Sequence, residues 1–189
     1  MKNIAVFCSS SDVLNEKMYQ QADALGRWIG QTQRNLIYGG SNLGLMKALS
    51  RGMWMEINSQ KSSTPKSEII GVVPEILIQN KKVSPYNTRQ ITCKDLTERK
   101  MIMMRESDVF IAMPGSIGTL DEVFSVMAQH IISIDKKKVI FWNIDGFWDK
   151  LFELFDSLRS TGVVYKPIES LYLKANTLEE VISFCNDKN

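Results

Sequence analysis

The stretch that decides the fold spans residues 108–122 and reads D-V-F-I-A-M-P-G-S-I-G-T-L-D-E. Residues 108–112 are mostly apolar and predict a short buried strand. Residues 114–119 then combine proline, glycine and hydroxyl side chains, which is typical of a tight turn. Apolar positions three and four apart follow, and they predict a helix over residues 119–134. A strand, a small-residue turn and a helix in this order indicate an α/β fold.

The rest of the chain repeats this alternation of short apolar runs and longer amphipathic runs. Further strands are expected over residues 4–8, 35–38, 68–73, 88–92, 139–142 and 170–173. Further helices are expected over residues 12–31, 43–57, 96–106, 147–158 and 178–185, with a polar linker at 60–66 and a loop at 80–87. The strands are rich in Ile and Val without strict alternation, as in a parallel sheet covered on both faces. We therefore predict a single domain, residues 1–189, built on a Rossmann-like doubly wound parallel sheet.

Composition narrows the classes of protein that this chain can belong to. With 23 Lys and Arg against 21 Asp and Glu, the net charge is +2, so no nucleic-acid-binding surface is expected. The apolar run at residues 4–8 is too short for a signal core or a membrane span. The cysteines Cys8, Cys93 and Cys185 lie far apart, so we expect free thiols and a cytoplasmic protein. A single histidine, His130, excludes a histidine-rich metal site.

Small residues gather in three turns, each of which follows a predicted strand. These turns are Ser9-Ser10-Ser11, Gly39-Gly40-Ser41 and Pro114-Gly115-Ser116-Ile117-Gly118-Thr119. In open parallel sheets, ligands bind outside the carboxyl ends of the strands. The sequence therefore places its chemistry at one edge of the sheet.

The third turn is the strongest candidate for a binding site. Gly115 and Gly118 permit close backbone approach, and Ser116 and Thr119 add hydroxyl groups. The helix that follows directs free N–H groups and the positive end of its dipole at the turn, which favours an anion such as phosphate. The alternative is a plain strand-to-helix turn in which Thr119 is the N-cap of the helix.

Three charged residues near this turn each have a structural and a functional interpretation. The sequence Thr119-Leu120-Asp121-Glu122 matches a capping box, in which Glu122 would reach back to the N-cap amide. Glu122 also lies one helical turn from the phosphate loop, where its carboxylate could face a sugar. Spacing favours the cap, and the two roles are compatible. Arg99 and Lys100 are typical of a solvated helix face, but cations at a helix start oppose its dipole, and an anionic ligand could hold them.

Four motifs in order resemble the Lonely Guy (LOG) family of cytokinin riboside 5′-monophosphate phosphoribohydrolases. The stretch P-G-S-I-G-T-L-D-E resembles that family's P-G-G-x-G-T-x-x-E. Residues 98–100, E-R-K, with residues 107–112, S-D-V-F-I-A, are similar to its E-R-K and S-D-A-F-I-A block. Residues 38–46, Y-G-G-S-N-L-G-L-M, and 6–11, V-F-C-S-S-S, are similar to its Y-G-G-G-x-x-G-L-M and V-F-C-G-S-S. One such motif would be weak evidence, but four in order are specific.

The resemblance implies hydrolysis of the N-glycosidic bond of a nucleoside 5′-monophosphate, of the AMP or cytokinin riboside type, to a free base and ribose 5-phosphate. It implies Glu122 and Arg99 as catalytic residues. It implies that the substrate is bound by Ser9, Gly40, Ser41, Lys100, Gly115, Ser116, Ile117, Gly118 and Thr119. Members are often labelled lysine decarboxylases, but that chemistry needs a pyridoxal-phosphate lysine, and the resemblance implies no metal or other cofactor. It also implies a homodimer, with no membrane or nucleic-acid partner.

Serine replaces the family's glycine at Ser9, Ser41 and Ser116. Serine disfavours positive φ, so these changes predict either a tighter cradle or extra hydroxyl donors for a phosphate. They also keep open a second interpretation, in which the chain is a non-catalytic carrier of a nucleotide or of the molybdopterin cofactor.

Overall fold

The computed structural model describes residues 1–59, 67–80, 82–134, 136–164 and 167–187. Within these residues, seven parallel strands form one sheet in the order β4-β3-β2-β1-β5-β6-β7. The strands are β1 Asn3–Phe7, β2 Asn35–Tyr38, β3 Ile69–Pro74, β4 Arg89–Cys93, β5 Val109–Ala112, β6 Val139–Trp142 and β7 Tyr172–Ala175. The predicted α/β fold is therefore confirmed.

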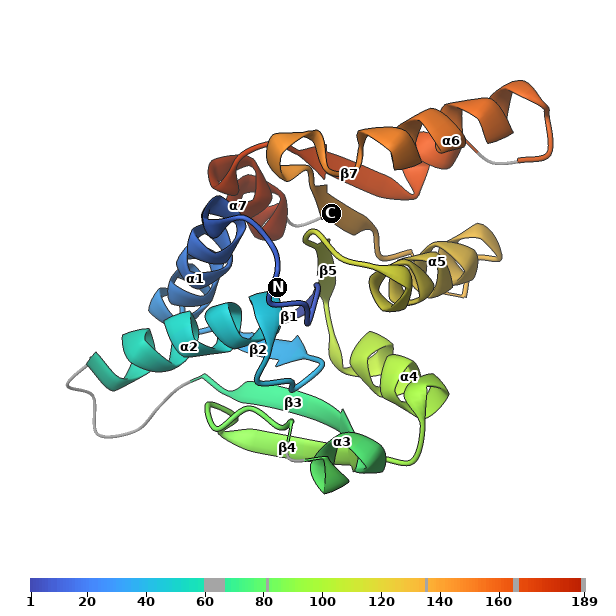
Figure 1. Cartoon of the computed structure of the whole chain (residues 1–189). Helices are drawn as coiled ribbons and strands as arrows, with labels where there is room; N and C mark the ends of the chain where they lie inside the picture. The colour runs from blue at the N-terminus through green and yellow to red at the C-terminus, as the bar shows by residue number, and fades with distance from the viewer. Residues whose placement is uncertain (60–66, 81, 135, 165–166, 188–189) are drawn as a thin grey trace.

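Helices cover both faces of the sheet. They are α1 Glu16–Gln31, α2 Gly44–Ser59, α3 Glu75–Gln79, α4 Leu96–Glu106, α5 Ile117–Ile131, α6 Asp149–Ser160 and α7 Leu178–Asn186. Figure 1 shows α1, α2 and α7 on one side of the sheet and α4, α5 and α6 on the other. In β1, Ile4 and Val6 join the core under the first group, whereas Ala5 and Phe7 join the core under the second. No helix in the described part of the chain combines the length and the apolar character needed to cross a membrane.

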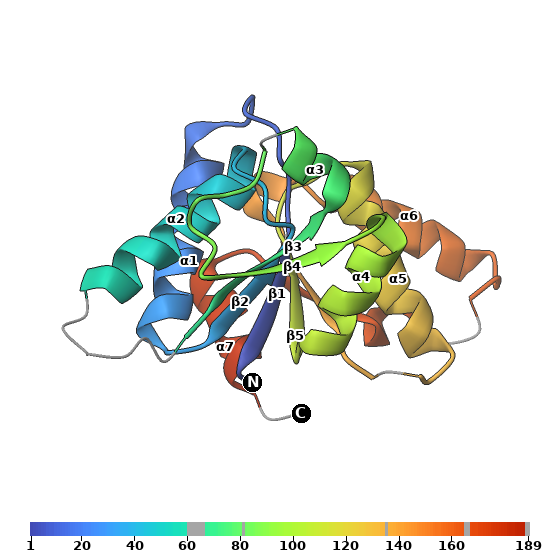
Figure 2. The same ribbon diagram turned by 90° about the horizontal axis from the view of Figure 1, so that it is seen from below.

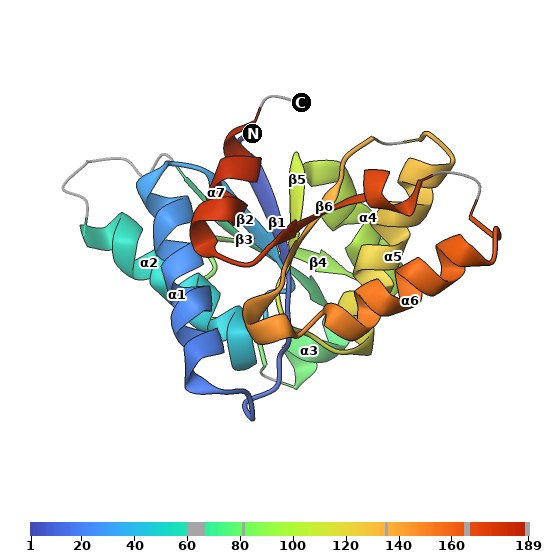
Figure 3. The same cartoon turned by 90° about the horizontal axis from the view of Figure 1, so that it is seen from above.

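The strand order reverses next to β1, and this reversal positions the candidate site. The chain runs outward from β1 to β4 on one side, then returns to place β5 against the other side of β1. The turns after β1 and β5 therefore leave the same edge toward opposite faces, which creates the crevice where doubly wound folds bind ligands. The start of β1 lies at the opposite edge, away from the turn that enters α1 (Figure 2, Figure 3).

Several predicted boundaries were wrong, each for a local reason. Helix α1 begins at Glu16 rather than residue 12, because Asn15 is its N-cap and accepts a hydrogen bond from the Met18 N–H. Helix α3 follows Pro74 directly and was not predicted, because five mostly exposed residues show no helical period. Strand β7 lies two residues beyond its predicted start, and the linker expected at 60–66 lies outside the described residues.

Candidate active site

The structure brings the three small-residue turns together at the carboxyl edge of the sheet. The Ser9 N–H donates to the Pro114 carbonyl at 3.0 Å, and the Leu45 N–H donates to the Ser9 carbonyl at 3.0 Å. The first turn thus contacts both the turn after β5 and the start of α2. Gly40 adopts a φ of +70°, a conformation that L side chains rarely take, which explains glycine there.

The start of α5 is open, whereas the start of α2 is occupied by the chain itself. The Asp12 carboxylate accepts a hydrogen bond from the Gly44 N–H at 2.8 Å, so an acidic side chain already sits at the positive end of α2. At α5, Ser116 is the N-cap but makes no capping hydrogen bond with its side chain. No described group accepts a hydrogen bond from the N–H groups of residues 117–119. These amides are available to an anion.

The three serines fit their turns without backbone strain. None of Ser9, Ser41 and Ser116 has a positive φ, the backbone conformation that serine disfavours. Ser9 Oγ accepts a hydrogen bond from the Ser11 N–H at 3.0 Å, and Ser41 is buried in a bridge with Val83. Ser116 is exposed beside the open amides of α5. It is therefore the serine whose hydroxyl faces the cradle most freely.

The predicted capping box at Thr119 and Glu122 is wrong. Helix α5 begins at Ile117, so Thr119 lies inside its first turn rather than at the N-cap. Thr119 is buried and packs over Gly115, where a built Cβ would lie 2.1 Å from the Thr119 Oγ1 atom. Glu122 is buried and lies in the second turn of the helix, away from the N-cap at Ser116. Glu122 is thus free of a capping role.

Glu122 and Arg99 form a buried pair beneath the cradle. Arg99 Nη1 lies 3.9 Å from Glu122 Oε1, and only 11% and 8% of the two side chains are exposed. Arg99 also donates from Nε to the Val72 carbonyl at 3.1 Å. Its Nη2 atom is buried and has no hydrogen-bond partner in the described structure. A buried donor without a partner is costly, so this atom is suited to meet a ligand.

Gly39 makes room for the Arg99 guanidinium. A Cβ built on Gly39 would lie 1.5 Å from Arg99 Nη2 and 2.8 Å from its Cζ. Any larger residue at position 39 would displace the guanidinium from the edge of the sheet. Sequence reasoning identified the glycine turn but missed this role, because no local signal connects position 39 to position 99.

Burial changes the acidity of Glu122. Burial raises the pKa of the Glu122 carboxyl to about 7, against a lowering effect of Arg99 and a smaller raising effect of Asp121. Burial likewise raises the pKa of the neighbouring Cys8 thiol, and the charge of Glu122 adds to that shift. A carboxyl group that titrates near neutral pH, held beside a cation and a phosphate-sized cradle, is suited to proton transfer.

A second ion pair lies next to the first on the same two helices. Lys100 Nζ lies 2.6 Å from Asp121 Oδ1. Asp121 and Glu122 are adjacent on α5 but point in different directions, since Asp121 is exposed and Glu122 is buried. Lys100, predicted to bind substrate, contacts the protein's own carboxylate in this structure.

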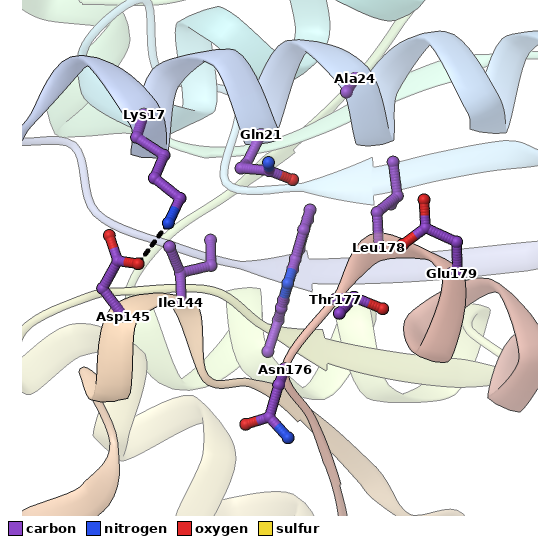
Figure 4. A pocket seen from close by; sticks show the side chains of 10 residues that line it. Lys17, Gln21, Ala24, Ile144, Asp145, Asn176, Thr177, Leu178 and Glu179 are labelled. Carbon is purple, nitrogen blue, oxygen red and sulfur yellow. Dashed lines mark hydrogen bonds and ion pairs between the residues drawn. The ribbon is translucent and has the colours of Figure 1, made fainter.

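A separate cavity of about 340 Å³ lies away from these groups, between the starts of α1 and α7 (Figure 4). It is lined by Lys17, Gln21, Ala24, Trp142, Ile144, Asp145, Asn176, Thr177, Leu178 and Glu179. An ion pair joins Lys17 and Asp145 at its side (Figure 4). None of the predicted site residues lines this cavity.

Two plant proteins are similar in sequence to this chain over 96% of its length. A probable cytokinin riboside 5′-monophosphate phosphoribohydrolase LOGL2 from Oryza sativa subsp. japonica is 31% identical over 183 residues, which cover 96% of this chain and 70% of the rice protein. LOG5 from Arabidopsis thaliana, a cytokinin riboside 5′-monophosphate phosphoribohydrolase, is 29% identical, covering 96% and 75% of the two chains.

Solved structures with the same fold include proteins of another description. The molybdenum cofactor binding protein from Rippkaea orientalis superposes with a TM-score of 0.72 at 23% identity, covering 97% of this chain and 94% of that one. The Moco carrier protein from Chlamydomonas reinhardtii gives a TM-score of 0.68 at 21% identity, with the same coverage. The model of the family described as "Possible lysine decarboxylase" matches residues 46–185. The chain therefore belongs to this family, the LOG family.

Proposed function

We propose that this protein hydrolyses the N-glycosidic bond of a nucleoside 5′-monophosphate, of the AMP or cytokinin riboside type, and releases the free base and ribose 5-phosphate. The observation that carries this proposal is the buried Glu122 carboxylate, 3.9 Å from Arg99 and one helical turn from an open helix N-terminus. A cradle for an anion and a carboxyl group titrating near neutrality are the two parts that this reaction needs.

The open amides of α5 hold the 5′-phosphate in this proposal. The donors are the N–H groups of Ile117, Gly118 and Thr119, joined by the hydroxyl of Ser116. The turns of Ser9, Gly40 and Ser41 close the opposite side of the crevice. Binding the phosphate at a distance from the reacting bond contributes free energy that places the sugar above Glu122.

Glu122 and Arg99 act on the sugar. Departure of the base leaves an oxocarbenium-like ribose, whose positive charge a nearby carboxylate stabilises. The departing base keeps the electron pair of the N-glycosidic bond. The same carboxylate orients a water molecule and accepts its proton as the water oxygen bonds to the anomeric carbon. This proton then passes to the base, so that the base leaves neutral and the carboxylate is restored. The unpartnered Nη2 of Arg99 donates a hydrogen bond to the substrate and holds it in register. The products are then the free base and ribose 5-phosphate.

The names of the rice and Arabidopsis relatives support this reaction class, since both are called phosphoribohydrolases of cytokinin riboside 5′-monophosphates. We further propose that residues 1–189 act as one nucleotide-binding domain in the cytoplasm and assemble as a homodimer. Exposed apolar side chains on α5 and α6 support a paired surface: Ile117, Phe124, Leu154 and Leu158.

The test is a panel of nucleoside 5′-monophosphates incubated with purified protein, with release of base and of ribose 5-phosphate both measured. We expect equal amounts of the two products from at least one purine nucleotide. The matched nucleosides, which lack the phosphate, should react far more slowly. Absence of turnover across the panel, while a plant relative reacts in parallel, would overturn the proposal.

The alternative is a carrier of a nucleotide or of the molybdopterin cofactor. It is motivated by the serine-containing turns and by the carriers that share this fold. In this case, the same panel and a pterin should raise the melting temperature without any release of base. Binding without turnover would favour the carrier over the hydrolase.

A further inference from the structure

We propose that Lys100 is a positioning residue rather than a phosphate ligand. Its ion pair with Asp121 fastens α4 to α5 and thereby sets the separation of Arg99 and Glu122. This inference rests on the proposed function, because it concerns the geometry of the same pair of groups.

The arrangement of the two ion pairs carries the argument. Arg99 and Lys100 are adjacent on α4, and their partners Glu122 and Asp121 are adjacent on α5. The Lys100–Asp121 contact is a hydrogen-bonded pair at 2.6 Å, whereas the Arg99–Glu122 contact spans 3.9 Å and is no hydrogen bond. The short pair is therefore the one that can define the distance between the helices. The Arg99–Glu122 distance then depends on the short pair. Arg99 is next to Lys100 on α4, and Glu122 is next to Asp121 on α5.

The surroundings of Lys100 agree with a role inside the protein. Its side chain is 18% exposed, although lysine is seldom buried, whereas the Asp121 side chain is 49% exposed. The carboxylate thus fixes the Lys100 ammonium beside the outer surface of α5. The amides that are open to a phosphate belong instead to the start of α5, around Ser116.

Groups on α4, on α5 and directly after β1 interact with Glu122. The Lys100–Asp121 pair therefore also influences the pKa of Glu122. Arg99 and Lys100 of α4 lower the pKa of Glu122, Asp121 of α5 raises it, and the Cys8 thiol, directly after β1, interacts with its charge. Removal of Lys100 alone leaves Asp121 uncompensated and raises the pKa of Glu122 further. Removal of Asp121 alone has the opposite effect. The two single variants should therefore move the pH profile in opposite directions.

The experiment compares Lys100→Met, Asp121→Asn, the double variant and the exchanged pair Lys100→Asp with Asp121→Lys. We expect each single variant to lower kcat about three- to fivefold, as for a partly exposed ion pair, while KM changes little. The rise of activity with pH should begin at higher pH in Lys100→Met and at lower pH in Asp121→Asn. The double variant should return toward the wild-type profile, the exchanged pair should recover most of kcat, and Lys100→Arg should retain activity.

A role in phosphate binding would give a different pattern. Lys100→Met would then raise KM at least tenfold and weaken inhibition by inorganic phosphate, whereas Asp121→Asn would leave both unchanged. The exchanged pair would be as defective as Lys100→Met. Any of these results would overturn the positioning role.

A readout without turnover separates this inference from the proposed reaction. Thermal shift with inorganic phosphate should be the same for wild type and Lys100→Met, and urea unfolding should show that the two single substitutions are not additive. If the wild type releases no ribose 5-phosphate, the proposed reaction fails, but these two measurements still test the role of Lys100. Loss of the phosphate shift in Lys100→Met, or strict additivity, would contradict it.

Discussion

Two helices of this protein begin with almost the same four residues and use them differently. Residues 177–180 read T-L-E-E at the start of α7, and residues 119–122 read T-L-D-E near the start of α5. At α7, Thr177 Oγ1 accepts from the Glu180 N–H at 3.2 Å, and Glu180 Oε2 accepts from the Thr177 N–H at 3.4 Å. At α5, neither half of this capping box forms, and Glu122 is buried beside Arg99.

The difference shows that the position of the N-cap decides whether the glutamate of this four-residue motif forms a capping box. At α7, Thr177 has an extended backbone two residues after the end of β7 and is the N-cap of the helix. At α5, Ser116 is the N-cap, three residues before Thr119, and Thr119 packs closely over Gly115. The same side chains are then carried one turn further along the helix. Glu180 accepts hydrogen bonds from backbone amides, whereas Glu122 is buried beside Arg99.

The largest expected effect separates the two glutamates by activity. Glu122→Gln should lower the release of ribose 5-phosphate about a thousandfold, because the neutral amide can neither accept a proton from water nor stabilise an oxocarbenium ion. Glu180→Gln is the matched control and should leave activity unchanged, since an amide oxygen can accept the same backbone hydrogen bonds. Steady-state kinetics on the reactive nucleotide measure both. Equal losses of activity in Glu122→Gln and Glu180→Gln would show that the two glutamates do not differ in function.

The next effect separates Glu122 from an ordinary surface glutamate by its response to pH. Burial raises its folded pKa from the ordinary value of 4.5 to about 7, so the stability that Glu122 contributes is present below pH 4.5 and lost as pH rises through 7. Relative to Glu122→Gln, the wild type should lose about 3 kcal/mol of unfolding free energy between these limits. Urea unfolding of both proteins from pH 4.5 to 8 measures the change. A constant difference over this range would show that Glu122 titrates normally.

The capping threonine offers a smaller test, on stability instead of activity. Thr177→Ala should reduce the unfolding free energy by about 1 kcal/mol, because it removes an N-cap, and should leave turnover unchanged. Thr119→Ala removes no cap and should instead raise KM, since Thr119 lies under the phosphate cradle. Urea midpoints and kinetics on both variants give the comparison. If Thr119→Ala lowered the unfolding free energy by about 1 kcal/mol and left KM unchanged, Thr119 would act as an N-cap, as Thr177 does.

The smallest effect concerns Ser116, which stands at the N-cap of α5 without capping it. Ser116→Gly should raise KM about threefold, as expected for one lost hydrogen bond while the backbone donors remain. Ser125→Ala is a suitable control, because its hydroxyl bonds to the Asp121 carbonyl within the same helix. An unchanged KM in Ser116→Gly would show that this hydroxyl does not contact the phosphate.

The sheet could be predicted well from the sequence, because strands buried on both faces appear as unbroken apolar runs. Strands β2 and β6 and helix α4 lie at their predicted bounds. Helix starts were predicted less well, since they depend on which side chain caps. Asp12, for example, looked like the beginning of α1 but caps α2 instead.

The site was only partly predictable, for a different reason. The turns could be located because glycine and serine mark them. The pairing of Arg99 with Glu122 depends on how α4 packs against α5, which no local pattern encodes. The burial of Glu122 follows from that packing as well, and so does its altered acidity. Local spacing therefore favoured a cap where the tertiary structure has a buried carboxyl group.

Gly39 has a consequence for how inactive members of such a family would be recognised. Its missing side chain is the space that the Arg99 guanidinium occupies. Replacing Gly39 with alanine would displace the Arg99 guanidinium, although every acidic, basic and hydroxyl side chain would remain in the sequence. A comparison of sequences that considers only the reactive residues would then classify such a chain as having a complete site. An arginine at position 99 can therefore take the position seen here only when the residue at position 39 has no side chain.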